Sequence, residues 1–181
     1  KHTGNEEYNW FLSVLFPASE LKILPYNRAV KDLNGLSQEE FLKEIRAIFT
    51  VKENADPSPK SPRNISMYLG KKWYGLSWPE VKSSNPVDKL DVSTLQNGVL
   101  HPLLGIDDPR TNNRIKFIGG IRGPQELVRL VDQKGYAVAF SMYPTTIDQL
   151  MAIADAGQIM PPKSTWFEPK LRTGLLSHEL A

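Results

Sequence analysis

Residues 65–78, ISMYLGKKWYGLSW, contain the pattern that decides the fold class. Two apolar and aromatic runs, 65–69 and 73–78, flank the short polar segment Gly70-Lys71-Lys72. Two such runs joined by a glycine-containing turn are typical of a β-hairpin. Because the strands of a hairpin run in opposite directions, we predict a mostly antiparallel sheet.

Helical periodicity is clearest over residues 37–48, where Ser37 and Glu40 have the spacing of a capping box. Further helices are predicted over 88–104, 125–134 and 146–154. Further strands are predicted over 10–16, 21–24, 49–51, 115–118, 137–142 and 175–180, with 10–16 and 21–24 paired as a hairpin and 137–142 central. Strands and helices are mixed without strict βαβ alternation. We therefore predict an α+β fold, a mixed, mostly antiparallel sheet with about four helices packed on it.

The length of 181 residues suits one domain with a substantial core. Three prolines within 55–62 predict that residues 54–63 form an exposed proline-rich loop. The first residue is Lys1 and not Met. We therefore expect residues 1–181 to be a single C-terminal domain of a longer protein.

Composition excludes several kinds of site. The chain has no cysteine, so it has no disulfides, thiol nucleophiles or cysteine zinc sites. His2, His101 and His178 lack the spacing of zinc ligands, and no metal site is predicted from them. A formal charge of +2 disfavours nucleic acid as a partner. The apolar runs are too short to span a bilayer and no signal peptide opens the chain, so we expect no membrane partner and a cytoplasmic location.

Residues 160–174, MPPKSTWFEPKLRTG, contain the clearest functional chemistry. Two prolines stiffen the backbone before a lysine and two hydroxyl groups. Lysine suits phosphate, and arginine can clamp an anion with two hydrogen bonds. The predicted ligand-binding residues are Lys163, Ser164, Thr165, Lys170 and Arg172. The alternative is a rigid structural crossing anchored in the core by Trp166 and Phe167. The glycine and lysine spacing of a P-loop is absent.

Residues 104–114 place Asp107 and Asp108 beside Arg110. Adjacent carboxylates could hold a hard cation such as magnesium or act as a general base, so both are candidate catalytic residues. Arg110 and Arg28 are candidate anion ligands. The alternatives are an ordinary Asp-Asp-Pro turn and a surface arginine. Gly119-Gly120 permits either the close approach of a ligand or a tight turn.

Taken together, several phrases resemble the C-terminal half of the bacterial and archaeal family called "domain of unknown function 1015". These phrases are FLSVLFP (11–17), LKILPYNR (21–28), LLGIDDPRT (103–111), FIGG (117–120) and MPPKSTWFEPKL (160–171). The resemblance implies an N-terminal half with a ParB-like Asp-Gly-His-His-Arg motif, which this chain does not contain.

The family has no established activity, and its ParB-like relatives include free-serine kinases and nucleotide-dependent DNA-binding proteins. The resemblance therefore implies a lobe that binds a small phosphorylated or anionic molecule. With the N-terminal half as its partner, the lobe would work as a kinase-like phosphotransferase acting on a small molecule such as serine. The alternatives are a non-catalytic structural or dimerisation lobe and a ParB-like nucleic-acid-binding module.

Overall fold

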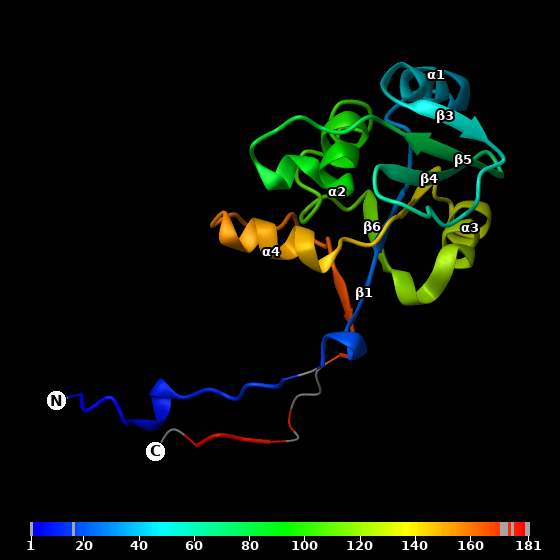
Figure 1. Cartoon of the computed structure of the whole chain (residues 1–181). Coiled ribbons are helices and arrows are strands. Elements are labelled where there is room, and N and C mark those ends of the chain that lie inside the picture. The colour runs from blue at the N-terminus through cyan, green and yellow to red at the C-terminus, as the bar shows by residue number, and fades with distance from the viewer. Residues whose placement is uncertain (1, 16, 171–173, 175, 180–181) are drawn as a thin grey trace. The chain divides into compact units, whose positions relative to one another are not determined.

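The structure, a computed structural model, describes residues 2–15, 17–170, 174 and 176–179. Its elements are labelled in Figure 1. The α-helices of the described residues are α1 (Gln38–Ile48), α2 (Asp91–Leu95), α3 (Gly123–Lys134) and α4 (Ile147–Asp155). The strands of these residues are β1 (Lys22–Leu24), β2 (Tyr26–Val30), β3 (Thr50–Glu53), β4 (Asn64–Leu69), β5 (Lys72–Ser77), β6 (Ile115–Gly119), β7 (Val138–Met142) and β8 (Trp166–Glu168). Short 3-10 helices span Glu7–Asn9, Ala18–Glu20, Pro86–Lys89 and Gly120–Arg122, and a π-helical turn spans Gln96–Leu100.

Six of the described strands form one sheet in the order β3-β5-β4-β7-β2-β6, and β1 and β8 form a separate two-stranded sheet. Every neighbouring pair within the large sheet is antiparallel. The predicted hairpin is confirmed as β4 and β5, with Leu69 opposite Lys72 across the turn. The α+β class with a mostly antiparallel sheet is confirmed.

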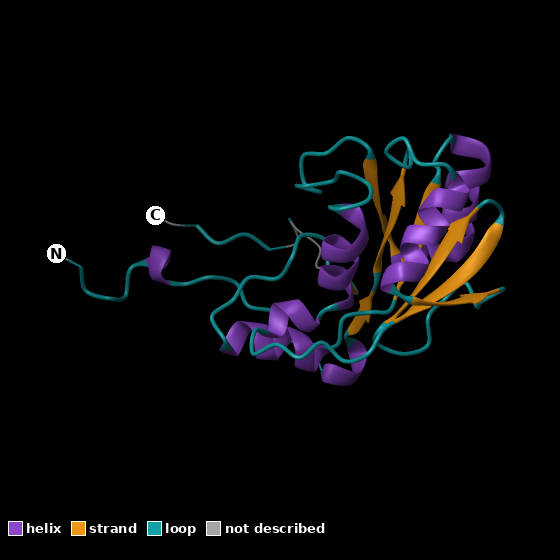
Figure 2. Cartoon of the chain, turned by 90° about the horizontal axis from the view of Figure 1, so that it is seen from above, coloured by secondary structure: helices purple, strands orange, loops and turns teal. Residues whose placement is uncertain are grey.

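Helices pack against both faces of the large sheet (Figure 2). Phe41 of α1, Leu95 of α2 and Ile153 of α4 belong to the main core, together with strand residues such as Phe140. Leu127 and Leu130 of α3 join Ala29 and Ala139 in a second cluster. Neighbouring residues in one strand point to opposite faces of a sheet, so Ala139 and Phe140 of β7 serve different clusters. The interior position of β7, predicted from its continuous apolar run, is confirmed.

The chain divides into two compact units. One comprises residues 23–166 and contains the large sheet, and the other comprises residues 1–22 and 167–181. We call the first the sheet unit. Residues 54–63 of the sheet unit are exposed or half-buried. Within the described residues, no helix combines the length and the apolar character needed to cross a bilayer.

Several predicted elements differ from the structure. Residues 10–15 form no strand, and β1 pairs with β8 rather than with them. The sequence pattern predicts that residues 25–28 leave the sheet, but β2 begins at Tyr26. The polar residues Asn27 and Arg28 are buried in it, which the sequence pattern does not indicate. The helix predicted over 88–104 is divided into a 3-10 turn, α2 and the π-helical turn. Of the strand predicted over 175–180, residues 175 and 180 lie outside the described residues, and 176–179 form no strand.

Candidate functional site

Arg28 is a buried cation in β2, an interior strand of the sheet, and is 3% exposed. Its Nη1 donates to the carbonyl oxygen of Tyr26 at 2.6 Å and its Nη2 to that of Lys163 at 3.3 Å. The guanidinium lies 5.4 Å from the centre of the Phe117 ring. Burial lowers the pKa of Arg28 to about 10, which still leaves the group charged at neutral pH. Among the described residues, no carboxylate forms an ion pair with it.

A cavity of about 310 Å³ opens beside Arg28. We call it the Arg28 cavity. Residues from separate parts of the sequence meet here, because β2, the loop after the π-helical turn and the loop of residues 160–165 converge. The lining residues are Arg28, Val92, Gln96, Asp107, Asp108, Pro109, Arg110, Phe117, Pro161 and Pro162. Four of the sequence-predicted site residues are thus brought together: Arg28, Asp107, Asp108 and Arg110.

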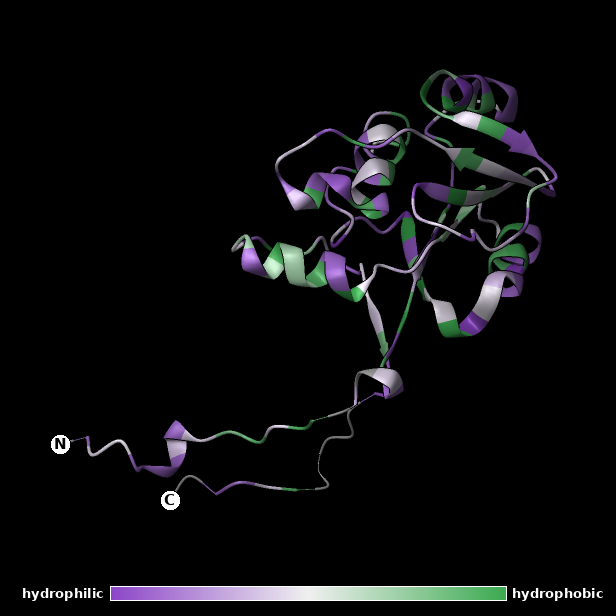
Figure 3. Cartoon of the chain, viewed as in Figure 1, coloured by the Kyte–Doolittle hydropathy of each residue, from purple (hydrophilic) through white to green (hydrophobic). Residues whose placement is uncertain are grey.

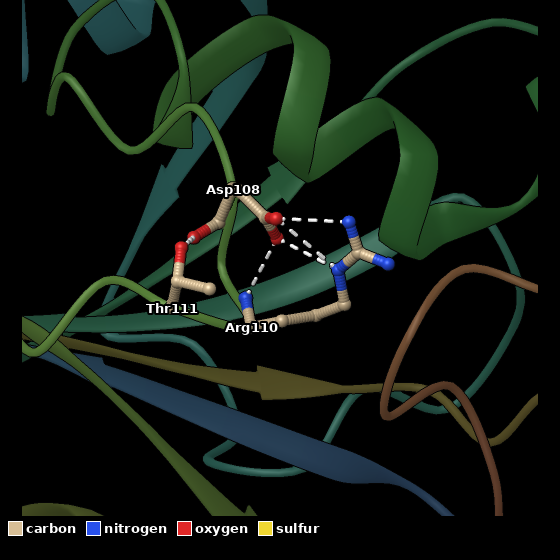
Figure 4. A network of polar contacts seen from close by, with 3 residues as sticks. All are labelled: Asp108, Arg110 and Thr111. Carbon is tan, nitrogen blue, oxygen red and sulfur yellow. Dashed lines mark hydrogen bonds and ion pairs between the residues drawn. The ribbon is translucent and has the colours of Figure 1, made fainter.

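Asp108 and Arg110 form a forked ion pair on the wall of this cavity (Figure 4). Arg110 Nε donates to Asp108 Oδ1 at 2.9 Å, and Nη2 donates to Oδ2 at 2.9 Å. The backbone N–H of Arg110 also donates to Oδ1, at 2.9 Å. These bonds lower the pKa of Asp108 and raise that of Arg110. Asp108 therefore orients Arg110, whose side chain is 70% exposed and can turn a further edge towards a ligand.

Asp107 accepts or shares a hydrogen bond with His101 Nδ1 at 2.7 Å, and its side chain is 82% exposed. Both carboxylates of the predicted magnesium pair thus already have partners. In the described part of the chain, no three His, Asp or Glu side chains cluster as metal ligands. The residues present do not fit a resident magnesium ion.

The loop of residues 160–165 places its predicted ligand residues in different environments. Lys163 is exposed and adopts φ of 55°, its carbonyl accepts from Arg28, and its Nζ lies 5.5 Å from the centre of the Tyr26 ring. Ser164 is buried, and its hydroxyl donates to the carbonyl of Pro161 at 2.6 Å. Its own carbonyl accepts from Thr145 Oγ1 at 3.2 Å. Ser164 therefore shapes the loop, because its hydroxyl is already used.

The other predicted ligand residues lie elsewhere. Thr165 is half-buried next to β8. Lys170 is exposed and belongs to the second compact unit. Arg172 lies outside the described residues.

A second cavity, of about 340 Å³, shares Phe117 and lies on the Lys163 side of the loop. We call it the Lys163 cavity. Its lining residues are Tyr26, Lys116, Phe117, Ile118, Gly119, Arg122, Lys163 and Trp166. Lys116 and Arg122 were not among the predicted site residues. The sequence signal that could have pointed to this cavity was Gly119-Gly120. A Cβ on Gly119 would overlap the Trp166 ring, so this end of the strand must lack a side chain for the ring to pack there.

Another cavity, of about 720 Å³ and larger than these two, lies elsewhere and is lined mainly by apolar surface around Trp78 and Pro79. The Trp78 Nε1 atom is buried with no partner. The charged residues that line this cavity carry both signs: Arg63 and Lys89 are basic, and Glu80 and Asp148 are acidic. Arg63 approaches Glu80 at 3.9 Å. Size alone favours this cavity as a ligand site. We prefer the smaller pair because a buried, uncompensated charge is a stronger sign of a ligand than volume.

Comparison with known proteins gives a family and a fold. The sequence profile of the family described as "Protein of unknown function (DUF1015)" matches residues 1–93. No curated protein matches the chain.

Among solved structures, the chain is similar to a mutant of a free serine kinase in complex with AMP, with a TM-score of 0.50, 15% identity, and coverage of 83% of this chain and 55% of that one. Free serine kinase in complex with AMP gives a TM-score of 0.49 at 13% identity, with coverage of 83% and 55%. A conserved hypothetical protein from Pyrococcus furiosus gives 0.45 at 14% identity, with coverage of 82% and 56%. The chain spans about 55% of the length of these kinase structures. The first likeness, at 15% identity, shows the fold alone.

Proposed function

The chain belongs to the family described as "Protein of unknown function (DUF1015)", and we propose that its sheet unit binds a small anionic ligand in the adjoining Arg28 and Lys163 cavities. The observation that carries this proposal is the Arg28 guanidinium, buried in an interior strand and bonded to two backbone carbonyls.

Burying a charge is costly unless an opposite charge compensates it. Backbone carbonyls satisfy hydrogen bonds of Arg28 but cannot cancel its full charge. A carboxylate or phosphate in the Arg28 cavity would do so, and Arg110 at the cavity wall, although paired with Asp108, would add further N–H donors. Both groups suit the planar geometry of guanidinium.

The finer proposal is phosphoryl transfer to a small molecule such as serine. It is supported by the fold likeness to free serine kinase, which is an analogy of fold and not of site. Phosphoryl transfer depends mainly on positioning and on neutralising charge, which Arg28, Arg110 and Lys163 could provide. Asp107 could orient a hydroxyl group, since its carboxylate is exposed at the cavity. Any magnesium would arrive with the phosphate groups, because the described acids form no site of their own.

We propose that residues 10–15 contact the N-terminal half that the family resemblance implies. Their apolar side chains are highly exposed: Trp10 61%, Phe11 84%, Leu12 59%, Val14 51% and Leu15 93%. Much of this stretch has the green of hydrophobic residues in Figure 3. Apolar residues occupy both alternating sets of positions, as in a strand covered on both faces. Solvent-exposed apolar surface of this extent marks an interaction site. The same segment is the observation that favours the alternative function, a structural or dimerisation lobe.

Isothermal titration with phosphate, pyrophosphate, AMP, serine and phosphoserine tests the ligand proposal. Arg110→Gln removes an exposed cation of the cavity, so it should weaken binding roughly tenfold, the value of one charge-assisted hydrogen bond. Lys72→Gln, an exposed charge loss on β5, is the matched control and should change nothing. Arg28→Lys keeps the buried charge but removes the planar guanidinium, so it should weaken binding of a planar anion; its unfolding midpoint is measured in parallel.

Two results would count against the proposal. One is the absence of binding by any of these anions to the wild-type chain. The other is equal affinity in wild type, Arg110→Gln and a folded Arg28→Lys. Light scattering of the chain and of Phe11→Ser/Leu15→Ser then separates the alternatives, since a dimerisation lobe should lose mass in the double variant.

A further inference from the structure

The Lys163 cavity differs from the Arg28 cavity in charge. Three cations line it, Lys116, Arg122 and Lys163, and none of the described residues that line it is acidic. The Arg28 cavity, by contrast, is lined by two arginines and two aspartates. The first cavity therefore offers a concentrated positive field, and the second a nearly balanced one.

Among the described residues, Glu126 forms an ion pair with Arg122 of the Lys163 cavity, but its carboxylate is already engaged by another cation. Arg129 holds both of its oxygens, with Nη2 at 2.7 Å from Oε1 and Nε at 2.8 Å from Oε2. Arg122 Nη1 lies 3.9 Å from the same carboxylate, beyond a normal hydrogen bond. Glu126 can compensate about one charge, and Arg129 takes most of that, so the cations of the cavity remain undercompensated.

Aromatic rings form the rest of the wall. Tyr26 packs edge-to-face against Trp166 at 5.3 Å between ring centres and against Phe117 at 6.5 Å. Trp166 in turn lies on Gly119, where a Cβ would overlap its ring. These packed rings exclude water from one side of the cavity. Coulombic attraction to a bound anion is stronger beside such a low-dielectric wall than in open solvent.

We propose that the Lys163 cavity is the phosphoryl subsite of this protein, taking a phosphate or pyrophosphate group, while the Arg28 cavity takes a carboxylate. This division rests on the proposed function above and goes further by assigning a different anion to each cavity. Phosphoryl groups carry about two negative charges and several acceptor oxygens, which match three cations. A carboxylate carries one charge and matches the single uncompensated guanidinium of Arg28.

The two subsites adjoin, so both ligands can be bound at once. Phe117 lines both cavities, and Arg28 Nη2 donates to the carbonyl of Lys163, whose side chain belongs to the second cavity. One residue therefore links the two: its backbone holds the carboxylate-binding arginine, and its ammonium group faces the phosphoryl subsite.

Isothermal titration of the 181-residue chain with inorganic pyrophosphate and, separately, with serine tests this division. Lys116→Gln and Arg122→Gln should each weaken pyrophosphate binding roughly tenfold and leave serine binding within about twofold. Arg110→Gln should do the reverse. Lys134→Gln, which removes an exposed charge at the far end of α3, should change neither. Lys116 and Arg122 are exposed, so unchanged unfolding midpoints are expected for both variants.

The outcomes separate this inference from the proposed function. If Arg110→Gln weakens pyrophosphate binding and Lys116→Gln and Arg122→Gln do not, the anion binds at Arg28, so the division is wrong while the proposed function stands. If pyrophosphate does not bind the wild-type chain at millimolar concentration, the subsite is overturned. If serine also fails to bind, the proposed function loses its support as well. A parallel titration with ADP identifies the source of the phosphoryl group: tighter binding than pyrophosphate indicates a nucleotide, and equal binding a free anion.

Discussion

Two neighbouring polar residues, Asn27 and Arg28, are buried in the same interior strand and are used differently. Asn27 Oδ1 accepts the backbone N–H of Met142 at 2.9 Å, so its amide replaces a backbone partner between β2 and β7. Arg28 bonds to carbonyls alone and keeps its charge uncompensated. A satisfied buried amide stabilises the fold, whereas an uncompensated buried cation needs a further reason to be retained.

Gly119 should be intolerant of substitution, because the Trp166 ring packs in the space that a Gly119 side chain would occupy. A Cβ there would overlap the indole ring. We expect Gly119→Ala to destabilise the protein by about 1–3 kcal/mol, as overpacking does, and to weaken pyrophosphate binding by moving a wall of the Lys163 cavity.

Urea unfolding followed by Trp fluorescence measures the effect. Gly98→Ala is the matched control: a Cβ there would make ordinary contacts with Ile48 and Phe49, 3.5 and 3.6 Å away. It should be neutral or slightly stabilising. Equal stability of both variants would show that Trp166 can move at no cost.

Asp91 should make stability depend on pH in the direction opposite to a paired carboxylate. It is 8% exposed, and burial raises its pKa from 3.8 to about 6, although the backbone N–H of Arg63 donates to both oxygens at 3.0 and 3.1 Å. The folded state then binds a proton more tightly than the unfolded state. The contribution of Asp91 to the free energy of unfolding is therefore fully present below pH 3.8, and it is lost as the pH rises through about 6.

Asp91→Asn removes this titration, so its stability relative to wild type should increase between about pH 4 and about pH 8, by at most about 3 kcal/mol. Urea unfolding of both proteins at the two pH values gives the difference, in which the other carboxylates cancel. Parallel pH profiles would mean that the folded-state pKa of Asp91 is normal.

At the scale of elements, helix starts are specified locally. Ser37 and Glu40 form the predicted capping box of α1: the Ser37 hydroxyl accepts the Glu40 N–H at 3.2 Å, and Glu40 Oε2 accepts the Ser37 N–H at 2.9 Å. Thr146 and Gln149 form a second capping box at α4. Gly135 follows α3 in the left-handed conformation that glycine adopts without strain. These signals involve residues a few positions apart, so they are present in the sequence itself.

Ser37→Ala should cost about 1 kcal/mol, because it leaves N–H groups of the first turn of α1 without a partner. The free energy of urea unfolding measures this. Ser58→Ala, at an exposed loop position, serves as the control and should be neutral. If the two variants were equally stable, the capping box would be of no consequence for the protein.

At the scale of the whole molecule, the hydrophobic core belongs to one unit. Every buried apolar residue of the described chain lies between Ala29 and Ile153, within the sheet unit. The other unit holds the exposed apolar residues 10–15 and its own polar contacts, such as His178 with Glu7 at 3.1 Å. The sheet unit should therefore provide most of the free energy of unfolding, and the exposed apolar residues 10–15 of the other unit should contact a protein partner.

Removal of residues 1–20 should leave the free energy of unfolding within about 1 kcal/mol of the full chain, because it removes no core residue. Urea unfolding followed by circular dichroism tests this, and light scattering should show less self-association. A variant that fails to unfold cooperatively would show that residues 1–20 contribute to the core.

The sequence by itself determined the α+β class, the β4–β5 hairpin, the capping box of α1 and the interior apolar strand. Each of these depends on neighbours close in the chain or on a run of one residue type. It also picked out Arg28, Asp107, Asp108, Arg110 and Lys163 as candidates from side-chain chemistry. Whether a side chain can bind an anion depends on its own chemistry, which the sequence states directly.

Only the tertiary structure decided which of these residues meet. Residues 10–15 do not form the predicted strand. An apolar run indicates that its side chains favour burial, but it does not specify the strand with which the run would pair. Arg28 lies beside Lys163 through a contact 135 positions apart, and Lys116 and Arg122 join them through the pairing of β2 with β6. Such placements depend on strand order and on loop paths, which are set by the packing of the whole sheet and leave no local mark in the sequence.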